Sequence, residues 1–320
     1  MQQEKGTPKI SIVLPVYNAG RFLRPCVDSL VNQTMADMEI ICVLDAPTDG
    51  SDRIMEEYAL KDNRIRIIRN PYNLNIGESR NVGINAARGL YIGFSDHDDT
   101  HELDMFEKLY SASDSGQKEL VLSDTLGIYG SQFPADEQAL RMFTALVQRD
   151  LGCAPTKHLY RRDFIEKYQI RFVDNNVTTT EDLIFNAQVL SHAANYRSKI
   201  GFVPELLFKH VDTNGNSSGS YSYWTMDKTV NSLHQLVDIA MSTTMSNKER
   251  QDMLAKLTLM LLYSSFYREY QQNGLAKTLA KFGSIKRDRG IHSHIRNISP
   301  SKMANTFPKY FFAWWTKVFC

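Results

Sequence analysis

Cysteine is scarce in this sequence, and its spacing limits what the chain can be. The four cysteines, Cys26, Cys42, Cys153 and Cys320, include no Cys-x-x-Cys pair. This usage indicates a reducing, cytosolic compartment, and the apolar patterns around Cys26 and Cys42 predict core thiols. No apolar run reaches the roughly 20 residues that span a bilayer. The polar start MQQEKGTPKI also lacks the pattern of a secretory signal.

An excess of charge of one sign is missing as well. The formal net charge of the 320 residues is +1, so the overall balance predicts no nucleic-acid partner. Basic residues gather only near the end, where residues 277–317 contain nine lysines and arginines against one acid, Asp288. Gly77, Gly83 and Gly89 form neither the G-x-G-x-x-G of dinucleotide enzymes nor a P-loop.

The sequence does contain a regular alternation of strands and helices. The residue pattern predicts four strands, at residues 9–17, 38–44, 64–70 and 90–95, the first of them a continuous β-branched run typical of a strand buried on both faces. Segments with helical spacing lie between them, which implies right-handed crossovers and a parallel sheet. Ligands bind beyond the carboxyl ends of such strands. We therefore expect four loops to converge on one crevice: residues 15–18, 45–51, 73–77 and 96–99.

The rest of the chain is less regular. It predicts a strand and turn at 118–130, a short strand with a helix at 156–172, and a helix at 178–194. Residues 205–220 predict a strand that enters a Gly/Ser/Asn-rich loop, and residues 246–274 predict a helix with a capping box, Ser246 with Glu249. The length suits one large domain with appended elements, or two domains.

Acidic side chains follow two of the predicted strands. Asp96 and Asp98 flank His97, so an extended chain places both carboxylates on one face. Such a pair suits a hard divalent cation that also binds phosphate, although an isolated Asp-x-Asp is common in solvated loops. Asp45 ends the second strand, where it can accept a hydrogen bond from a base or a ribose hydroxyl. Arg80 either pairs with phosphate or a base in the same crevice, or is a surface arginine.

Two further candidates lie in the second half of the chain. Glu181 and Asp182 begin the predicted helix at 181–192, where acids either stabilise the helix dipole or serve a site. His210 separates an apolar strand from the polar loop, so it is either a structural histidine or a ligand. The sequence alone leaves both choices open.

Taken together, these motifs resemble those of a known family. The segments ISIVLPVYN, VLDAPTDGS, NLNIGESRNVGINAARGLYIGFSDHDD and TKHLYRRDFI…RF…TEDLIFNAQVL are similar to family 2 of the GT-A glycosyltransferases. The resemblance covers about residues 9–220 and implies an α/β fold, with a Rossmann-like, mostly parallel sheet, flanking helices and a C-terminal helical extension. It implies three regions: a nucleotide-sugar half (1–105), an acceptor half (106–224) and a helical C-terminal region (225–320).

The resemblance also implies an activity. Family members carry out an inverting, metal-dependent transfer of a sugar, usually from a UDP-sugar, with Mn²⁺ or Mg²⁺ as the cofactor. The acceptor is then a saccharide hydroxyl, in bacterial members commonly lipid-linked, in the synthesis of O-antigen or capsule. Two alternatives stay open: a sugar nucleotidyl or phosphoryl transferase, and a binding module that lacks turnover.

Residue roles follow from the matched motifs. The resemblance places the nucleotide at Pro15, Val16, Tyr17, Asn18, Asp45, Arg80, Asp96 and His97, and the metal at Asp98 with His210 as a further candidate ligand. It makes Asp182 the base, beside Glu181, and directs Lys157 to the acceptor or the donor diphosphate. The chain departs from the pattern after the second strand, where Leu44-Asp45 replaces an acid pair and Ala46-Pro47 replaces Gly-Ser.

The end of the chain combines aromatic and basic residues. Residues 309–319, KYFFAWWTKVF, suit either the surface of an anionic membrane or a helix docked on protein. We expect peripheral attachment to the cytoplasmic face of the cell membrane. The sequence is compatible with an oligomer and does not specify one.

Overall fold

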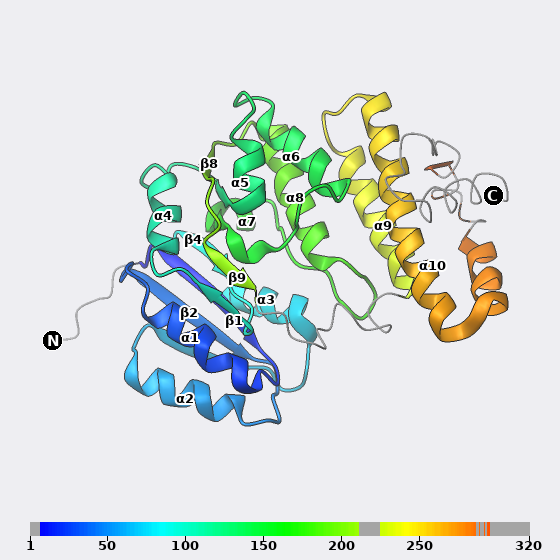
Figure 1. The fold of residues 1–320 in the computed structure, drawn as a ribbon. Helices are drawn as coiled ribbons and strands as arrows, with labels where there is room; N and C mark the ends of the chain where they lie inside the picture. Colours follow the sequence, from blue (N-terminus) through cyan, green and yellow to red (C-terminus); the bar gives the residue numbers. More distant parts are fainter. Residues whose placement is uncertain (1–6, 211–224, 286–287, 289–290, 292, 295–320) are drawn as a thin grey trace.

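A mixed seven-stranded sheet organises the molecule (Figure 1). The computed structural model describes residues 7–210, 225–285, 288, 291 and 293–294. The strand order is β3-β2-β1-β4-β7-β6-β8. The strands are β1 (Ile10–Val16), β2 (Met38–Leu44), β3 (Ile65–Arg69), β4 (Tyr91–Phe94), β6 (Leu120–Ser123), β7 (Leu159–Arg161) and β8 (Ile200–Val203). The four strands predicted at the start of the chain are therefore confirmed.

Strand direction decides which loops share an edge of the sheet. The first four strands are mutually parallel, and β7 is antiparallel to both β4 and β6. Strand β6 therefore runs in the same direction as β4, and β8 pairs parallel to β6. The segments that follow β1, β2, β4, β6 and β8 all begin at one edge, as expected for an α/β fold with a mostly parallel sheet.

Helices cover both faces of the sheet. They are α1 (Leu23–Val31), α2 (Ser51–Lys61), α3 (Asn75–Ala86), α4 (Met105–Ala112), α5 (Asp124–Gly130), α6 (Gln138–Val147), α7 (Arg162–Lys167) and α8 (Glu181–Tyr196), with short 3-10 turns at Gly20–Phe22 and Pro155–Lys157. Successive residues of β1 serve different cores, since Ile12 packs with α1, α2 and α4 while Val13 packs with α3, α6 and α8. This alternation is the period of two that a strand imposes on its side chains.

Two glycines explain how helices approach the sheet closely. A Cβ atom on Gly83 of α3 would lie 2.2 Å from Cγ1 of Val13 in β1, so only glycine allows this contact. A Cβ atom on Gly127 would lie 2.6 Å from the carbonyl oxygen of Leu122. The predicted turn within 118–130 is therefore wrong: its glycines permit α5 to fold back onto the end of β6.

Two appended parts complete the described chain. A two-stranded ribbon pairs β5 (Asp99–His101) with β9 (Phe208–His210), and the rest of the predicted loop at 211–224 lies outside the described residues. The C-terminal helices are α9 (Met226–Met241) and α10 (Asn247–Ile285), with a kink at Gly274, where φ is 74°. The Ser246–Glu249 capping box is confirmed, because the amide of Ser246 donates to Glu249 Oε2 over 3.3 Å and the amide of Glu249 donates to Ser246 Oγ over 3.4 Å. Within the described residues, no helix is both long and apolar enough to cross a bilayer.

Candidate active site

Asp45 anchors the loops at the carboxyl ends of the first strands. It follows β2, is 2% exposed, and accepts hydrogen bonds at Oδ1 from Asn70 Nδ2 (2.7 Å) and from the amide of Leu74 (2.8 Å). Asn70 follows β3, and Leu74 precedes α3. Asp45 thus ties the segment after β2 to the segment between β3 and α3 through uncharged donors, as predicted for the loops at 45–51 and 73–77.

The loops after β1 and β2 are also bound to each other. Asn18 Oδ1 accepts the amide of Thr48 over 2.8 Å, and Asp49 Oδ2 accepts the amide of Gly20 over 2.8 Å. Of the residues predicted to line a base pocket, Pro15 and Val16 are buried in β1, whereas Tyr17 is 44% exposed and Asn18 is also exposed. The exposed pair lies where a ligand above the sheet edge could reach it.

The departure after β2 has a structural consequence. Ala46 adopts a left-handed backbone with φ of 52°, a conformation that glycine occupies far more readily than alanine. Pro47, which follows, fixes its own φ and restricts the residue before it. This loop is therefore both strained and stiff.

Arg80 connects the segment after β4 to the start of α8. It lies on α3 and is 1% exposed. Its Nη2 donates to Asp96 Oδ1 over 2.7 Å, and its Nη1 donates to Asp182 Oδ1 over 2.6 Å. The guanidinium also lies 5.0 Å from the ring centroid of Phe172. Burial opposes its charge, but Asp96 and Asp182 together raise the pKa of Arg80 above its ordinary value. The arginine is thus a buried, permanently charged bridge.

Asp182 is tuned toward a pKa near neutrality. It lies in the first turn of α8, and its side chain is 25% exposed. Burial raises the pKa of Asp182 to about 7, Arg80 acts in the opposite direction, and Glu181 and Asp96 add to the rise. Glu181 itself is 6% exposed. A carboxylate with such a pKa exchanges a proton readily near pH 7, as a general base must.

Buried polar groups form hydrogen bonds to and beside the Asp96–Asp98 segment. The thiol of Cys26 donates to the carbonyl oxygen of Asp96 over 3.3 Å, and Ser95 Oγ lies 2.8 Å from His101 Nε2. Burial lowers the pKa of His101 to about 4, so this imidazole is neutral at physiological pH. Cys26 and Cys42 are both fully buried, as predicted. The sequence predicted Cys26 as core but did not indicate its contact with the acidic segment.

The two candidate metal ligands are Asp98, which offers hard carboxylate oxygens, and His210, which offers an imidazole nitrogen. Asp98 and His97 are partly exposed at the end of β4, and His210 ends β9, where its backbone pairs with that of Asp99. The side chain of His210 lies outside the described residues. Among the residues that the structure describes, no cluster of three acidic, histidine or cysteine side chains could hold a metal ion by itself. This donor set fits Mg²⁺ or Mn²⁺ shared with substrate phosphates, and does not fit an all-protein cage.

Lys157 pairs with an acid that sequence reasoning missed. Its ammonium forms an ion pair with Asp124, the first residue of α5, and lies 5.1 Å from the ring centroid of Phe208. The available signal was position, since Asp124 follows β6 just as Asp45 follows β2. Because residues 124–130 were predicted as a turn, the equivalent positions of Asp124 and Asp45 were not recognised.

Comparison with known proteins agrees with this arrangement. Residues 11–169 match the model of glycosyl transferase family 2. The chain is 35% identical over 201 residues to the uncharacterized glycosyltransferase EpsJ of Bacillus subtilis, which covers 58% of this chain and 57% of EpsJ. It is 34% identical over 202 residues to the poly(ribitol-phosphate) beta-glucosyltransferase of Bacillus spizizenii, covering 59% of this chain and 31% of that protein.

A solved structure extends the likeness in fold. The S. aureus TarS fragment 1–349, crystallised in complex with UDP, superposes with a TM-score of 0.68 at 15% identity, covering 97% of this chain and 88% of that one. The chain thus spans little more than half of EpsJ in sequence while sharing the fold of the TarS fragment over nearly its whole length. Matched motifs, sheet topology and these likenesses agree, and the protein belongs to glycosyl transferase family 2.

Proposed function

We propose that the protein transfers a sugar from a UDP-sugar to a hydroxyl of a saccharide acceptor, with inversion at the anomeric carbon. One observation carries this proposal: Arg80 joins Asp96, at the end of β4, to Asp182, at the start of α8. The acid expected near the nucleotide and the acid expected to act as base are therefore held at one place. The UDP complex of TarS supports the choice of donor.

The chain's own residues supply positioning and proton transfer. Pro15 to Asn18 and Asp45 would border the base of the nucleotide, and Asp96 would meet its ribose. Asp98 would hold Mg²⁺ or Mn²⁺, which when bound stabilises the charge that develops on the departing diphosphate. Asp182 would take the proton of the acceptor hydroxyl at Oδ2, because Arg80 binds Oδ1. One protein base is enough for a direct displacement.

The experiment that tests this function is a product analysis. The purified protein is incubated with a panel of UDP-sugars and candidate saccharides, with and without Mn²⁺. We expect free UDP together with a new glycoside, or free UDP and free sugar when water is the acceptor. Release of pyrophosphate would instead support nucleotidyl transfer. Absence of turnover despite UDP binding would support a binding module.

We also propose peripheral attachment to a membrane carrying a lipid-linked acceptor. Residues 309–319 lie outside the described residues, so the support is the sequence: aromatic residues beside lysines and a basic stretch before them. A relative, the poly(ribitol-phosphate) beta-glucosyltransferase, is named for a polymer, which supports a polymeric acceptor. Flotation with anionic vesicles should retain the full chain and lose a truncation after residue 300. Equal flotation of both proteins would contradict attachment through the tail.

A further inference from the structure

Asp124 lies at the same edge of the sheet as the nucleotide-side acids. Strand β6, which precedes it, runs in the same direction as β4, which precedes Asp96. One strand, β7, separates the two, so their ends are about 10 Å apart at the usual spacing of neighbouring strands. This offset leads away from the base-side loops toward the second half of the domain. A sugar attached to a nucleotide diphosphate would extend in that direction.

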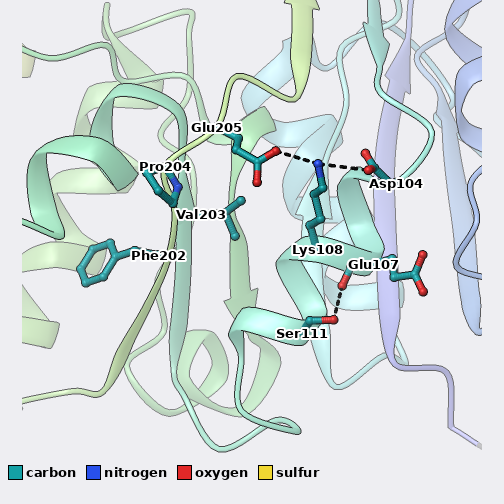
Figure 2. Close-up of a pocket in the computed structure, with 8 residues that line it drawn as sticks. All are labelled: Asp104, Glu107, Lys108, Ser111, Phe202, Val203, Pro204 and Glu205. Carbon is teal, nitrogen blue, oxygen red and sulfur yellow. Dashed lines mark hydrogen bonds and ion pairs between the residues drawn. The ribbon is translucent and has the colours of Figure 1, made fainter.

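The backbone of Asp124 is held in a strained conformation. Its φ is 57°, in the left-handed region, and the residue is 6% exposed. Its amide donates to the carbonyl oxygen of Glu205 over 3.1 Å. Glu205 is fixed in turn, because its carboxylate pairs with Lys108 over 2.6 Å and Lys108 also pairs with Asp104 (Figure 2). Strain that the surroundings enforce at a sheet edge is typical of functional positions.

The residues around the Asp124–Lys157 pair are fixed by hydrogen bonds on both strands. The hydroxyl of Ser123 donates to the carbonyl oxygen of Lys157, and the amide of Ser123 donates to His158 Nδ1 over 3.1 Å. Burial and the neighbouring Lys157 lower the pKa of His158 to about 3, so the imidazole stays neutral and accepts this bond. The ion pair is therefore built on a rigid base.

Lys157 also lies beside the ribbon of β5 and β9, which begins directly after Asp98. Its ammonium lies over the ring of Phe208, and Phe208 pairs with His101 across the ribbon of β5 and β9. Strand β5 starts at Asp99, directly after Asp98. The lysine side chain is 25% exposed, so a part of it remains accessible.

The charges at this edge are predominantly negative. The acids are Asp96, Asp98, Asp124, Glu181 and Asp182. Among the described residues of the site, the bases are Arg80 and Lys157, and each is paired with carboxylate. A carboxylate on the donor sugar would thus meet acids, and the one lysine at this position is already neutralised by Asp124.

We propose that Asp124 selects the class of donor sugar: by neutralising Lys157, it makes the site accept an uncharged hexose or N-acetylhexosamine and reject a uronic acid. This inference rests on the proposed function, since it assumes a nucleotide-sugar donor. Removal of the Asp124 charge would leave the Lys157 ammonium available to a sugar carboxylate. Selectivity of this kind comes from an unfavourable charge for the wrong ligand as much as from contacts with the right one.

The test is a binding competition in the presence of Mn²⁺. Affinities for UDP, UDP-glucose, UDP-N-acetylglucosamine and UDP-glucuronate are measured by calorimetry with the full chain. We expect wild type to bind at least one uncharged donor about tenfold or more tightly than UDP-glucuronate. The quantity compared is the ratio of the dissociation constant of UDP-glucuronate to that of the uncharged donor. Asn at position 124 also tolerates a left-handed backbone, and in Asp124→Asn this ratio should fall by about tenfold.

Two further variants make the result specific. Asp163→Asn removes the same charge at the opposite edge, because Asp163 follows β7, and it should leave the ratio unchanged. Asp124→Asn alone should bind UDP-glucuronate more tightly than wild type does. In the double variant Asp124→Asn with Lys157→Met, this gain should disappear. If Asp124→Asn fails to fold, Lys157→Met alone should weaken UDP-glucuronate binding relative to the uncharged donors.

Several outcomes would overturn the inference. These are a wild-type preference for UDP-glucuronate, an unchanged ratio in folded Asp124→Asn, a gain that persists in the double variant, or an unchanged ratio in Lys157→Met. Failure of UDP itself to bind wild type is a different result, which would contradict the proposed function and the inference with it.

Discussion

Asp45 and Asp182 show two different ways of holding an acid at one sheet edge. Asp45, in the first half of the domain, is 2% exposed and accepts hydrogen bonds from an amide side chain and a backbone amide. Asp182, in the second half, is 25% exposed and is held by the Arg80 guanidinium. Neutral donors hold Asp45 in place, whereas at Asp182 burial raises the pKa and the Arg80 guanidinium lowers it. The first half thus fixes its acid through neutral donors, and the second half holds the acid that we propose as the base.

Replacement of Arg80 should have the largest effect, because this residue joins the two halves. Arg80→Met leaves Asp96 and Asp182 without their common partner and places an apolar group among carboxylates. Breaking such a buried pair costs roughly 3 kcal/mol of unfolding free energy, the lower end of the usual range, since both acids keep some exposure. Chemical denaturation measures the loss, and unchanged stability would contradict the bridging role.

Asp182→Asn should lower turnover without lowering the affinity for UDP, and so separate the proposed proton transfer from nucleotide binding. Removal of a general base lowers turnover by about 10²-fold or more. UDP affinity should hardly change, because Asp45 and the loops after β1 and β2 stay intact. Steady-state rates combined with calorimetry measure both quantities, and Asp163→Asn serves as the control. Turnover close to that of wild type would remove Asp182 from the role of base.

Gly83→Ala tests the packing of the first half alone. The added Cβ would meet Cγ1 of Val13 at 2.2 Å, which forces α3 away from β1. Overpacking of this kind costs about 1–3 kcal/mol, reduced in part by the better helix propensity of alanine. A lower melting temperature is expected. Since Arg80 lies one turn earlier on α3, turnover should also fall, and a fully active, equally stable variant would contradict this geometry.

The pH dependence of the transfer rate should follow the protonation of Asp182, which lies in the second half. The pKa of Asp182 is raised to about 7, so its basic form is lost as the pH falls through that value. Transfer should therefore slow about tenfold for each pH unit below about 7 and level off above it. A profile of kcat/KM against pH measures this. A flat profile between about pH 5 and about pH 8, a range that brackets the pKa of Asp182, would show that Asp182 does not limit the reaction.

An exposed ion pair of the first half gives the smallest expected effect. Arg24 and Glu57 are 2.7 Å apart but 50% and 52% exposed. Pairs that are this exposed contribute little to stability, because solvent and salt screen the two charges. Arg24→Ala should accordingly change the unfolding free energy far less than Arg80→Met. A loss of similar size in both variants would mean that burial does not distinguish the two arginines.

The two halves also differ in how far the sequence predicts them. Strands β1, β2 and β4 are continuous buried runs and β3 is a partly exposed edge strand, so local residue patterns located all four, and residues after parallel strands had to meet at one edge. The Arg80–Asp182 contact spans 102 positions and depends on how α3 and α8 pack, which local patterns do not encode. Asp124 was missed because glycines at 127 and 130 resemble turn signals, although here they serve close packing.

The Arg80 bridge has a consequence for recombination between relatives. A chimaera that takes residues 1–105 from this chain and the remainder from another family member inherits only one end of that bridge. It will work only when the incoming segment supplies an acid where α8 begins, matched in reach to an arginine on α3. Compatibility at this single junction, more than overall identity, should decide which first and second halves can be exchanged.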